Sequence, residues 1–283
     1  MMLIQDKKND IFYRRWPAQE ARAVLLLIHG LGAHSGRWEF LGDFFQKNNI
    51  SSYALELKGF GQTQGTRGHI DSLGIYFRDI RFLYDIIKRE NPEKKIFLLG
   101  ESMGALFCFL FAALEPRLFS GLICISPAFS SKLRFSFWVY LNIGLALAFN
   151  PKRHFPVPIT PEMCTRDIEY QKVIASDQLD KHTASARLYW NIFKAQNKAK
   201  SEAGKINIPV LFLSAGEDTV VDPAATRKIF NSLKTKDKKL INYPAMRHAL
   251  SIESGREKVF GDILDWMEVS GRLQRPAPMN RMG

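Results

Sequence analysis

Cysteine is scarce in this chain, with three residues among 283. They are Cys108, Cys124 and Cys164, and no two of them have the Cys-x-x-Cys spacing. Three cysteines cannot form a disulfide framework, and the missing spacing excludes the commonest zinc and redox motifs. We therefore expect a protein of a reducing compartment that needs neither a metal nor an organic cofactor.

Long apolar runs are lacking as well. The first ten residues, MMLIQDKKND, contain no apolar core of the length that a signal peptide needs. The longest apolar stretch, FSFWVYLNIGLALAF at 135–149, contains Asn142 and Gly144. It is also shorter than the ~20 residues of a membrane span. We expect a cytoplasmic protein without a transmembrane helix.

Acidic residues are outnumbered, because 40 Lys and Arg face 28 Asp and Glu for a formal net charge of +12. Such an excess can direct a protein to nucleic acid or to an anionic membrane surface. The basic residues are dispersed, however, and their densest groups, at 150–154 and 234–239, accompany no nucleic-acid-binding motif. We expect no nucleic-acid partner, and the composition leaves the oligomeric state open.

The sequence does contain a regular alternation of apolar strands and helical segments. Apolar runs that suit buried strands occur at 23–30, 51–61, 94–100, 118–128, 209–218 and 238–245. Helical spacing of apolar residues occurs at 72–92, 102–116, 223–234 and 256–269. This order predicts an α/β fold with a mostly parallel central sheet flanked by helices on both faces.

The alternation stops between residues 129 and 205. This stretch is rich in Phe, Trp and Pro and shows no strong strand pattern. An insertion of this kind between a strand and the next βα unit predicts a helical cap, or lid, over one end of the sheet. We therefore expect a core of residues 1–128 and 206–270, a cap at 129–205 and a disordered tail at 271–283.

A single serine stands between two glycines in GESMG at 100–104, where a predicted strand meets a predicted helix. At such a turn, Gly-x-Ser-x-Gly forms a nucleophile elbow in which larger residues at the glycine positions would clash. Ser102 would lie at a helix N-terminus, which favours negative charge. The alternative is a tight turn with an incidental serine, but the strand before it and the apolar helix after it favour a nucleophile.

A serine hydroxyl needs a base, and in this architecture an acid and then a histidine follow it along the chain. His248 is the one histidine after His182, and it lies just past the last predicted strand. Asp218 follows the fifth predicted strand and could orient the imidazole. Glu217 is adjacent and stays an alternative, whereas Asp222 is better explained as a helix N-cap.

Acyl transfer also needs hydrogen-bond donors for the oxyanion. One should be the backbone N–H of Met103, the residue after the nucleophile. The second should come from the loop HGLGAHSGRW at 29–38, and we expect the N–H of Leu31. In that loop, His29 and His34 are better explained as structural residues than as catalytic ones.

Six stretches of the chain resemble the α/β-hydrolase superfamily, and within it the monoacylglycerol lipases and the bacterial lysophospholipases similar to them. They are HGLGAHSGRW (29–38), LKGFGQTQGTRGHIDS (57–72), GESMGA (100–105), TRDIEYQKVIASDQL (165–179), SAGEDTVVD (214–222) and MRHAL (246–250). The resemblance implies an α/β-hydrolase fold. It also places Ser102, Asp218 and His248 at the positions of the catalytic triad, and Leu31 and Met103 at those of the oxyanion hole.

The resemblance further implies which residues bind substrate. Arg37 and His34 match positions at the headgroup end of the family's site. Two positions depart from the mammalian monoacylglycerol lipases: Ala33 stands in place of an acidic residue, and Ile174 in place of a tyrosine that helps bind the glycerol headgroup. We expect the change at Ile174 to alter monoglyceride selectivity while ester hydrolysis is retained.

The function expected from these residues is that of a serine ester hydrolase. Its substrate would be monoacylglycerol or a similar single-chain lipid ester, from which it releases a fatty acid through an acyl-enzyme. Alternatives are a short- to medium-chain carboxylesterase, or a lysophospholipase without monoglyceride selectivity. A non-catalytic, binding version of the fold would usually lack a triad member, and this chain supplies all three.

The apolar residues of the predicted cap have two interpretations. The segments 135–149 and 187–193 could form the mouth of an acyl tunnel and contact a membrane surface. Basic residues beside the first segment could then meet anionic lipid headgroups; they are Lys132, Arg134, Lys152 and Arg153. Equally, the same apolar residues could simply pack the cap onto the core.

Overall fold

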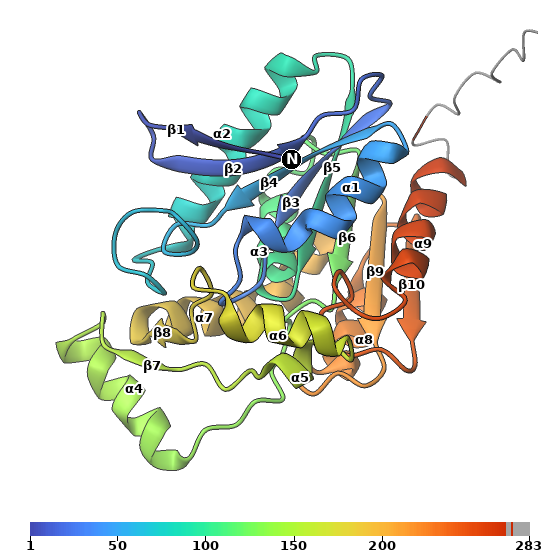
Figure 1. Ribbon diagram of the computed structural model, residues 1–283. Coiled ribbons are helices and arrows are strands. Elements are labelled where there is room, and N and C mark those ends of the chain that lie inside the picture. Colours follow the sequence, from blue (N-terminus) through green and yellow to red (C-terminus); the bar gives the residue numbers. More distant parts are fainter. Residues whose placement is uncertain (270–272, 274–283) are drawn as a thin grey trace, which may run out of the picture.

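The computed structural model describes residues 1–269 and Leu273 of the 283-residue chain. Eight strands form one sheet in the order β1-β2-β4-β3-β5-β6-β9-β10 (Figure 1). The strands are β1 (Met2–Asp6), β2 (Ile11–Trp16), β3 (Ala23–Ile28), β4 (Ile50–Glu56), β5 (Lys95–Glu101), β6 (Gly121–Ile125), β9 (Val210–Ala215) and β10 (Lys238–Tyr243). The tail predicted to be disordered lies outside the described residues, apart from Leu273.

Strands β4, β3, β5, β6, β9 and β10 are parallel. Each lies within one of the predicted apolar runs, apart from the first residue of β4 and the last residue of β5. Every residue of β3, β6 and β9 is buried. Continuous branched-aliphatic strands of this kind need helices on both faces, because both faces exclude water. The sheet thus confirms the predicted fold class.

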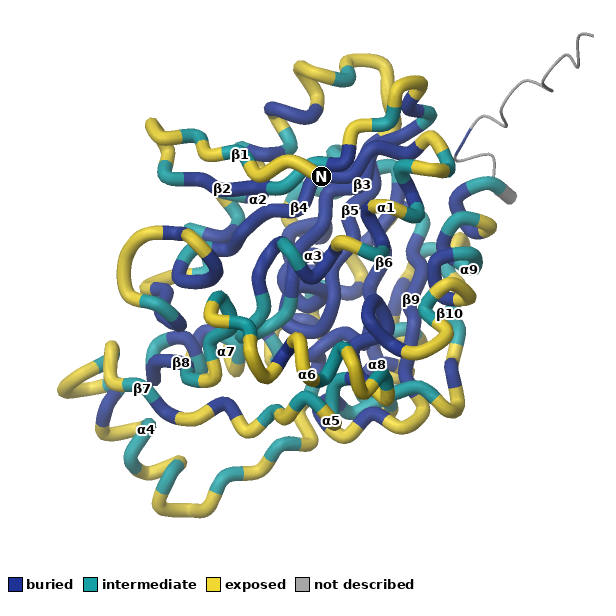
Figure 2. Tube along the Cα trace, viewed as in Figure 1, coloured by how far each residue is buried: buried dark blue, intermediate teal, exposed yellow. Residues whose placement is uncertain are grey.

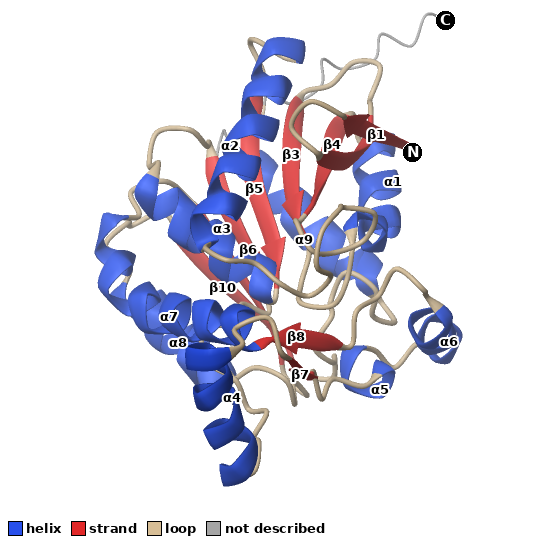
Figure 3. Cartoon of the chain, turned by 90° about the vertical axis from the view of Figure 1, so that its left-hand side faces the viewer, coloured by secondary structure: helices blue, strands red, loops and turns tan. Residues whose placement is uncertain are grey.

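Helices cover both faces of the sheet (Figure 3). One apolar cluster joins the sheet to α1 (Glu39–Lys47) and α9 (Arg256–Val269). A larger cluster on the other face joins it to α2 (Leu73–Glu90), α3 (Met103–Leu114) and α8 (Pro223–Ser232). In α3 only Leu114 among the twelve residues is exposed, as its apolar composition predicts. This packing holds the start of α3 rigidly at the end of β5.

The N-terminal strands and α1 were not among the predicted elements. β1 and β2 form an antiparallel hairpin that continues onto β4. β1 is an exposed edge strand, and Arg14 and Arg15 interrupt the apolar residues of β2. Neither strand therefore has the continuous apolar run that marks a strand buried on both faces.

The segment between β6 and β9 stays outside the main sheet. It contains α4 (Phe137–Phe149), β7 (His154–Pro156), α5 (Pro161–Cys164), α6 (Ile168–Ser176), β8 (Thr183–Ser185), α7 (Ala186–Glu202) and the short 3-10 helix η2 (Ala203–Lys205). Figures 1 and 3 show it beyond the end of the sheet where the parallel strands terminate. β7 and β8 pair antiparallel, although no strand was predicted here.

Helix α4 is apolar yet largely exposed, and it forms the projecting edge of this segment (Figure 2). Of its thirteen residues, Ala146 alone is buried. Phe137, Trp138 and Phe149 are 71%, 68% and 84% exposed. Packing onto the core therefore does not account for the outer face of α4. Among the described residues, no helix combines the length and apolarity that a membrane crossing requires.

Candidate active site

Ser102 stands at the sharp turn between β5 and α3. Its backbone has φ 57° and ψ −121°, in the region that non-glycine residues seldom adopt. The turn brings chain segments very close, since a Cβ on Gly104 would lie 2.2 Å from the carbonyl oxygen of Ile28. A Cβ on Gly100 would lie 2.6 Å from the backbone nitrogen of Ala105. Only glycine fits both positions, and the serine hydroxyl projects from the turn.

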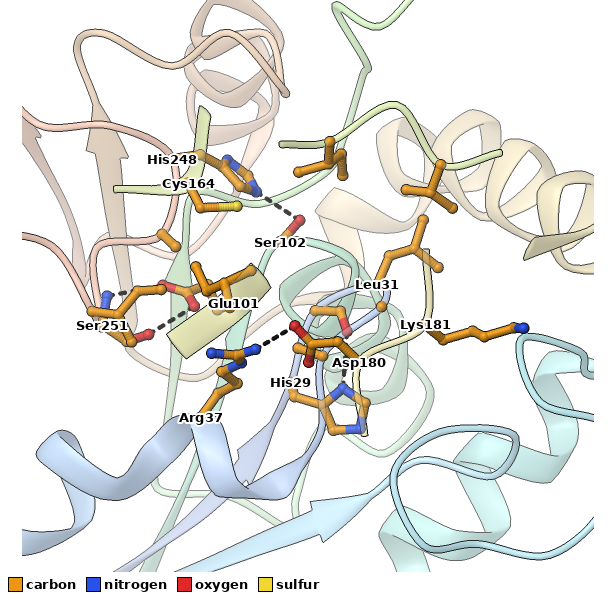
Figure 4. A pocket seen from close by; sticks show the side chains of 18 of the residues that line it. His29, Leu31, Arg37, Glu101, Ser102, Cys164, Asp180, Lys181, His248 and Ser251 are labelled. Atoms are coloured by element: carbon orange, nitrogen blue, oxygen red, sulfur yellow. Dashed lines mark hydrogen bonds and ion pairs between the residues drawn. The ribbon is translucent and has the colours of Figure 1, made fainter. Parts of the chain in front are cut away.

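Three side chains form a hydrogen-bonded chain at this turn. The hydroxyl of Ser102 is 2.9 Å from Nε2 of His248, and Nδ1 of His248 is 2.8 Å from Oδ2 of Asp218 (Figure 4 shows the first contact). All three residues are buried. The structure therefore brings together the serine, the base and the acid that the sequence predicts, although they lie far apart along the chain.

The acid that faces His248 is Asp218 rather than its neighbour. Oδ1 of Asp218 accepts hydrogen bonds from the N–H groups of Val220 and Val221 at 2.8 and 2.9 Å, which leaves Oδ2 for the imidazole. Glu217 is exposed. Asp222 accepts from the N–H of Ala224 and caps α8, as its position before Pro223 predicts.

The charges at this site favour a protonated histidine. Burial alone would lower the pKa of His248, but the negative charge and hydrogen bond of Asp218, with a smaller effect from Glu101, raise it above the ordinary 6.5. Burial would raise the pKa of Asp218, and the attraction of His248 outweighs this and lowers it. The site can therefore stabilise the imidazolium that forms when a base takes a proton from Ser102.

Leu31 and Met103 lie beside Ser102 and line the same cavity. Met103 is the first residue of α3, and the first N–H groups of a helix have no partner within it. Leu31 follows Gly30, which packs against Ser102 so closely that a Cβ there would lie 3.7 Å from the hydroxyl oxygen. Both residues line the cavity into which Ser102 opens.

His29 holds this loop in place. Its Nε2 accepts a hydrogen bond from the N–H of Leu57 at 3.1 Å, and Nδ1 lies 2.9 Å from the carbonyl oxygen of Gly30. Burial lowers its pKa to about 4, so the ring is neutral and serves as one acceptor and one donor. This agrees with the structural role expected for His29.

Two cavities meet at Ser102. The larger measures about 430 Å³ and lies under α4 and α7, with apolar lining residues that include Ile143, Leu147 and Phe193. The smaller measures about 90 Å³, lies on the other side of Ser102 and has a mixed lining. Leu31, Val157 and Ile159 line both, as does Ser102 itself. A group bound to Ser102 can thus extend in two directions of different chemistry.

The three residues expected to bind substrate do not all line a cavity at Ser102. Arg37 and Ile174 line the smaller cavity. His34 lines neither cavity. Its Nδ1 accepts from the N–H of Gly36 at 3.1 Å, and its Nε2 lies 2.8 Å from Oδ2 of Asp177. The structure therefore brings Arg37 and Ile174 to the Ser102 site and places His34 behind it.

A family model described as "Serine aminopeptidase, S33" matches residues 19–255 of the chain. The chain belongs to this family. Relatives of this S33 protein include the human monoglyceride lipase, 27% identical over 274 residues that make up 94% of this chain and 89% of that protein. They also include phospholipase YtpA of Bacillus subtilis, 28% identical over 255 residues, which are 87% of this chain and 95% of that one.

Two solved structures have a fold similar to that of this chain. The monoacylglycerol lipase of Paleococcus ferrophilus superimposes with a TM-score of 0.83 at 25% identity, covering 91% of this chain and 98% of that one. A monoglyceride lipase variant from Saccharomyces cerevisiae superimposes with a TM-score of 0.84 at 22% identity, covering 94% and 92%. The fold is that of the α/β-hydrolases, as the sequence motifs implied.

Arg37 lies at the centre of a buried charge cluster behind the smaller cavity of this S33 protein. Its guanidinium donates to Asp180 and lies 3.4 Å from Asp177. Burial alone would lower the pKa of Arg37, and the carboxylate of Asp180 with Tyr170 raises it, so the guanidinium stays charged. His34, Asp177 and Asp180 lie close enough to share a cation. Arg37 already supplies that charge, so we assign the cluster as ion pairs.

Sequence reasoning did not assign Glu101 or Lys132 to the site. Glu101 lines the smaller cavity and precedes Ser102. Lys132 was expected at a lipid surface, but its ammonium donates to the backbone oxygen of Asp218 at 2.8 Å. An acidic residue that ends an apolar strand was a usable signal for Glu101. The partners of Arg37 and Lys132 lie 143 and 86 residues away along the chain, so local sequence gave no signal.

Proposed function

We propose that this protein is a serine hydrolase of lipid esters. Ser102 attacks the ester carbonyl while His248 takes its proton, and the N–H groups of Leu31 and Met103 stabilise the oxyanion. His248 then protonates the departing alcohol, and later activates the water that releases the fatty acid. Asp218 orients the imidazole throughout. The family, the fold and the lipase relatives support a carboxylic ester hydrolase.

The observation that carries this proposal is the large apolar cavity that opens beside Ser102. Among the described residues that line it, none carries a charge. A fatty-acyl chain can fill such a space, since burial of each methylene contributes about 0.8 kcal/mol. The free ammonium group that an aminopeptidase must bind would need a nearby carboxylate, and the carboxylates of Glu101 and Asp180 line the smaller cavity instead. The lining of the larger cavity therefore supports an acyl chain more than a peptide N-terminus on that side of Ser102.

The smaller cavity supports a small alcohol as the leaving group. Its ~90 Å³ would hold roughly six to nine water-sized groups, at about 10–15 Å³ each. The glycerol of a monoacylglycerol has six heavy atoms and fits this space. We therefore propose monoacylglycerol or a similar single-chain ester as the substrate. The phospholipase relative keeps lysophospholipids as the second candidate class.

We further propose that residues 129–205 act as a cap subdomain and that its outer face contacts membrane surfaces. The exposed apolar side chains of α4 support this, because patches of this kind commonly mark interaction sites. The exposed basic residues Arg134, Lys152 and Arg153 flank the helix and could meet anionic headgroups, whereas the ammonium of Lys132 is bound to the backbone oxygen of Asp218. Substrate would then pass from the lipid surface into the cavity under α4.

A substrate series tests the proposed function. We expect turnover of a monoacylglycerol and of medium-chain p-nitrophenyl esters, with weaker turnover of lysophosphatidylcholine. Ser102→Ala should abolish all of it without lowering the melting temperature. Ser52→Ala, a buried serine on β4, is the matched control and should keep full activity. Full activity of Ser102→Ala, or turnover of acetate esters alone, would contradict the proposal.

A further inference from the structure

Glu101 directly precedes the nucleophile, and the proposed mechanism does not use its side chain. It is the last residue of β5 and is 9% exposed. Both oxygens of its carboxylate accept hydrogen bonds from Ser251: Oε1 from the N–H at 3.0 Å and Oε2 from the hydroxyl at 2.8 Å (Figure 4). Glu101 is therefore a buried acid that is held by two hydrogen bonds from a single residue.

The partner belongs to the loop that carries the base. Ser251 lies three residues after His248, in the turn that follows β10. Glu101 and Ser251 are 150 residues apart in the sequence, so their contact joins two segments that the chain itself does not hold together. These are the same segments whose separation sets the 2.9 Å distance between Ser102 and His248. The Glu101–Ser251 contact therefore joins the same two segments between which a proton would pass from Ser102 to His248.

The charge of Glu101 also reaches His248. Burial raises the pKa of Glu101 above its ordinary value, and this outweighs the two Ser251 hydrogen bonds and the nearby His248, which lower it. A carboxylate that accepts at both oxygens is in the arrangement that the ionised form makes. The titratable or charged groups around it are His248, Asp218 and Cys164, and the same cavity is lined by His29, Arg37, Asp180, Lys181 and His182.

We propose that Glu101 is a positioning residue that holds the His248 loop against Ser102 and supplies a second negative charge to the imidazolium. This inference deepens the proposed function and rests on it. Asp218 contacts one ring nitrogen and fixes its orientation, whereas Glu101 acts from the Ser102 side through Ser251 and through space. A purely structural Glu101 would support folding and leave the titration of His248 unchanged.

The test is a titration of His248 by NMR in protein labelled at histidine, with His248→Asn used to assign the signal among the six histidines. In Glu101→Gln, we expect the His248 transition to move to lower pH, because a neutral amide no longer favours the charged ring. We expect kcat to fall about tenfold with KM nearly unchanged, since ring position affects proton transfer more than substrate binding. An unmoved transition would overturn the proposal.

Two further variants separate the charge from the contact. Ser251→Ala keeps the carboxylate and removes one hydrogen bond, so kcat should fall while the His248 transition stays near that of the wild type. Glu101→Asp keeps the charge but is too short to hold both bonds, and should behave like Ser251→Ala. If Glu101→Gln does not fold, the double variant Glu101→Asp/Ser251→Ala provides the test. Its fall in kcat should not exceed that of either single variant, because both changes break the same contact. Additive falls in kcat would overturn the proposal.

The titration also distinguishes the two proposals. Because it needs no substrate, it reports on Glu101 even if the wild-type protein hydrolyses none of the esters offered. Absence of ester turnover in the wild type would contradict the proposed function, whereas an unmoved His248 transition contradicts the role of Glu101 alone.

Discussion

Two buried histidines near Ser102 show how neighbouring carboxylates determine the pKa of an imidazole ring. Burial dominates at His29 and lowers its pKa to about 4, so this ring stays neutral and holds a loop. At His248, Asp218 and Glu101 outweigh burial and raise the pKa above 6.5. The second ring can therefore gain and lose a proton at a pH where the first cannot.

At the residue scale, we predict the pH dependence of Asp218→Asn. The base must be neutral to act, so wild-type kcat/KM should fall as pH decreases through the raised pKa of His248. In the variant, kcat/KM should drop about 10³- to 10⁴-fold, and its acid limb should move to lower pH, since the raising carboxylate is gone. Glu217→Gln is the matched control and should keep both the rate and the limb. A larger loss of kcat/KM in Glu217→Gln than in Asp218→Asn would assign the role of the acid to Glu217 instead.

Much of the candidate site could be predicted from the sequence. Gly100 and Gly104 around Ser102 follow from the steric demands of one turn, and His248 follows from chain order. The choice between Asp218 and Glu217 needed the structure, because adjacent residues in a loop can each face either way. The Glu101–Ser251 contact joins segments 150 residues apart, and no local pattern announces such a pair.

At the element scale, α4 presents apolar side chains in two directions. Ile143 and Leu147 face the cavity that opens beside Ser102, and they pack with Phe155 and Ala186. Phe137, Trp138 and Phe149 face outward. One helix can therefore line the acyl site and also present an apolar surface, which explains why neither side of it has the polar residues typical of an exposed helix.

A larger side chain in the cavity should shorten the acyl chain that is accepted. In Ile143→Trp, we expect kcat/KM for a myristoyl ester to fall about tenfold, because the indole occupies space that the distal methylenes need. The rate with a butyryl ester should stay within about twofold of the wild type. Phe149→Trp, on the outer face of α4, is the control and should leave both rates unchanged. Equal losses for the two esters in Ile143→Trp would refute this placement of the acyl chain.

The outer face of α4 should bind lipid. We expect Phe137→Ser/Trp138→Ser to weaken binding to phosphatidylglycerol vesicles roughly tenfold in a sedimentation assay, because two large apolar side chains no longer enter the interface. The free energy of unfolding should change little, since both residues are exposed. Leu3→Ser/Leu114→Ser removes two exposed apolar side chains elsewhere. If this control loses as much vesicle binding, the contact is not specific to α4.

The elements of the core follow from the sequence more closely than those of the cap segment. Parallel strands buried on both faces leave continuous apolar runs, and the six predicted strands are all present. In the cap segment, β7 and β8 have three residues each, and α5 has four. Elements this short depend on contacts with distant segments, such as the hydrogen bond from Ser185 N–H to the Gly68 carbonyl, rather than on periodicity.

At the scale of the whole molecule, an ion pair and backbone hydrogen bonds tie the segment 129–205 to the core on the side of the Leu31 loop. Arg37 pairs with Asp180, the N–H of Lys181 donates to the Gly32 carbonyl at 2.8 Å, and Arg67 donates to the Leu179 carbonyl at 2.6 Å. α4 instead packs mainly on β7 and α7 of its own segment. α4 is thus tied mainly to its own segment, whereas the stretch around Asp180 is bonded directly to the core.

Breaking the central ion pair should loosen this attachment. In Arg37→Met, Asp180 is left buried without its partner, and we expect the free energy of unfolding to fall by about 3–5 kcal/mol. The double variant Arg37→Met/Asp180→Leu removes both charges and should recover most of the loss. Urea unfolding of the three proteins measures this. Equal stability of the single and double variants would show that the pair does not hold the segment.

If the proposed mechanism holds, the two cavities at Ser102 would also impose an order on turnover. An alcohol in the smaller cavity could depart while the acyl group remained esterified to the serine and kept the larger cavity filled. Water would then enter by the vacated side, and the fatty acid would be released last. We expect the residence time of the acyl product to lengthen with its chain, so that the turnover number declines for long chains even where the chemical steps are equally fast.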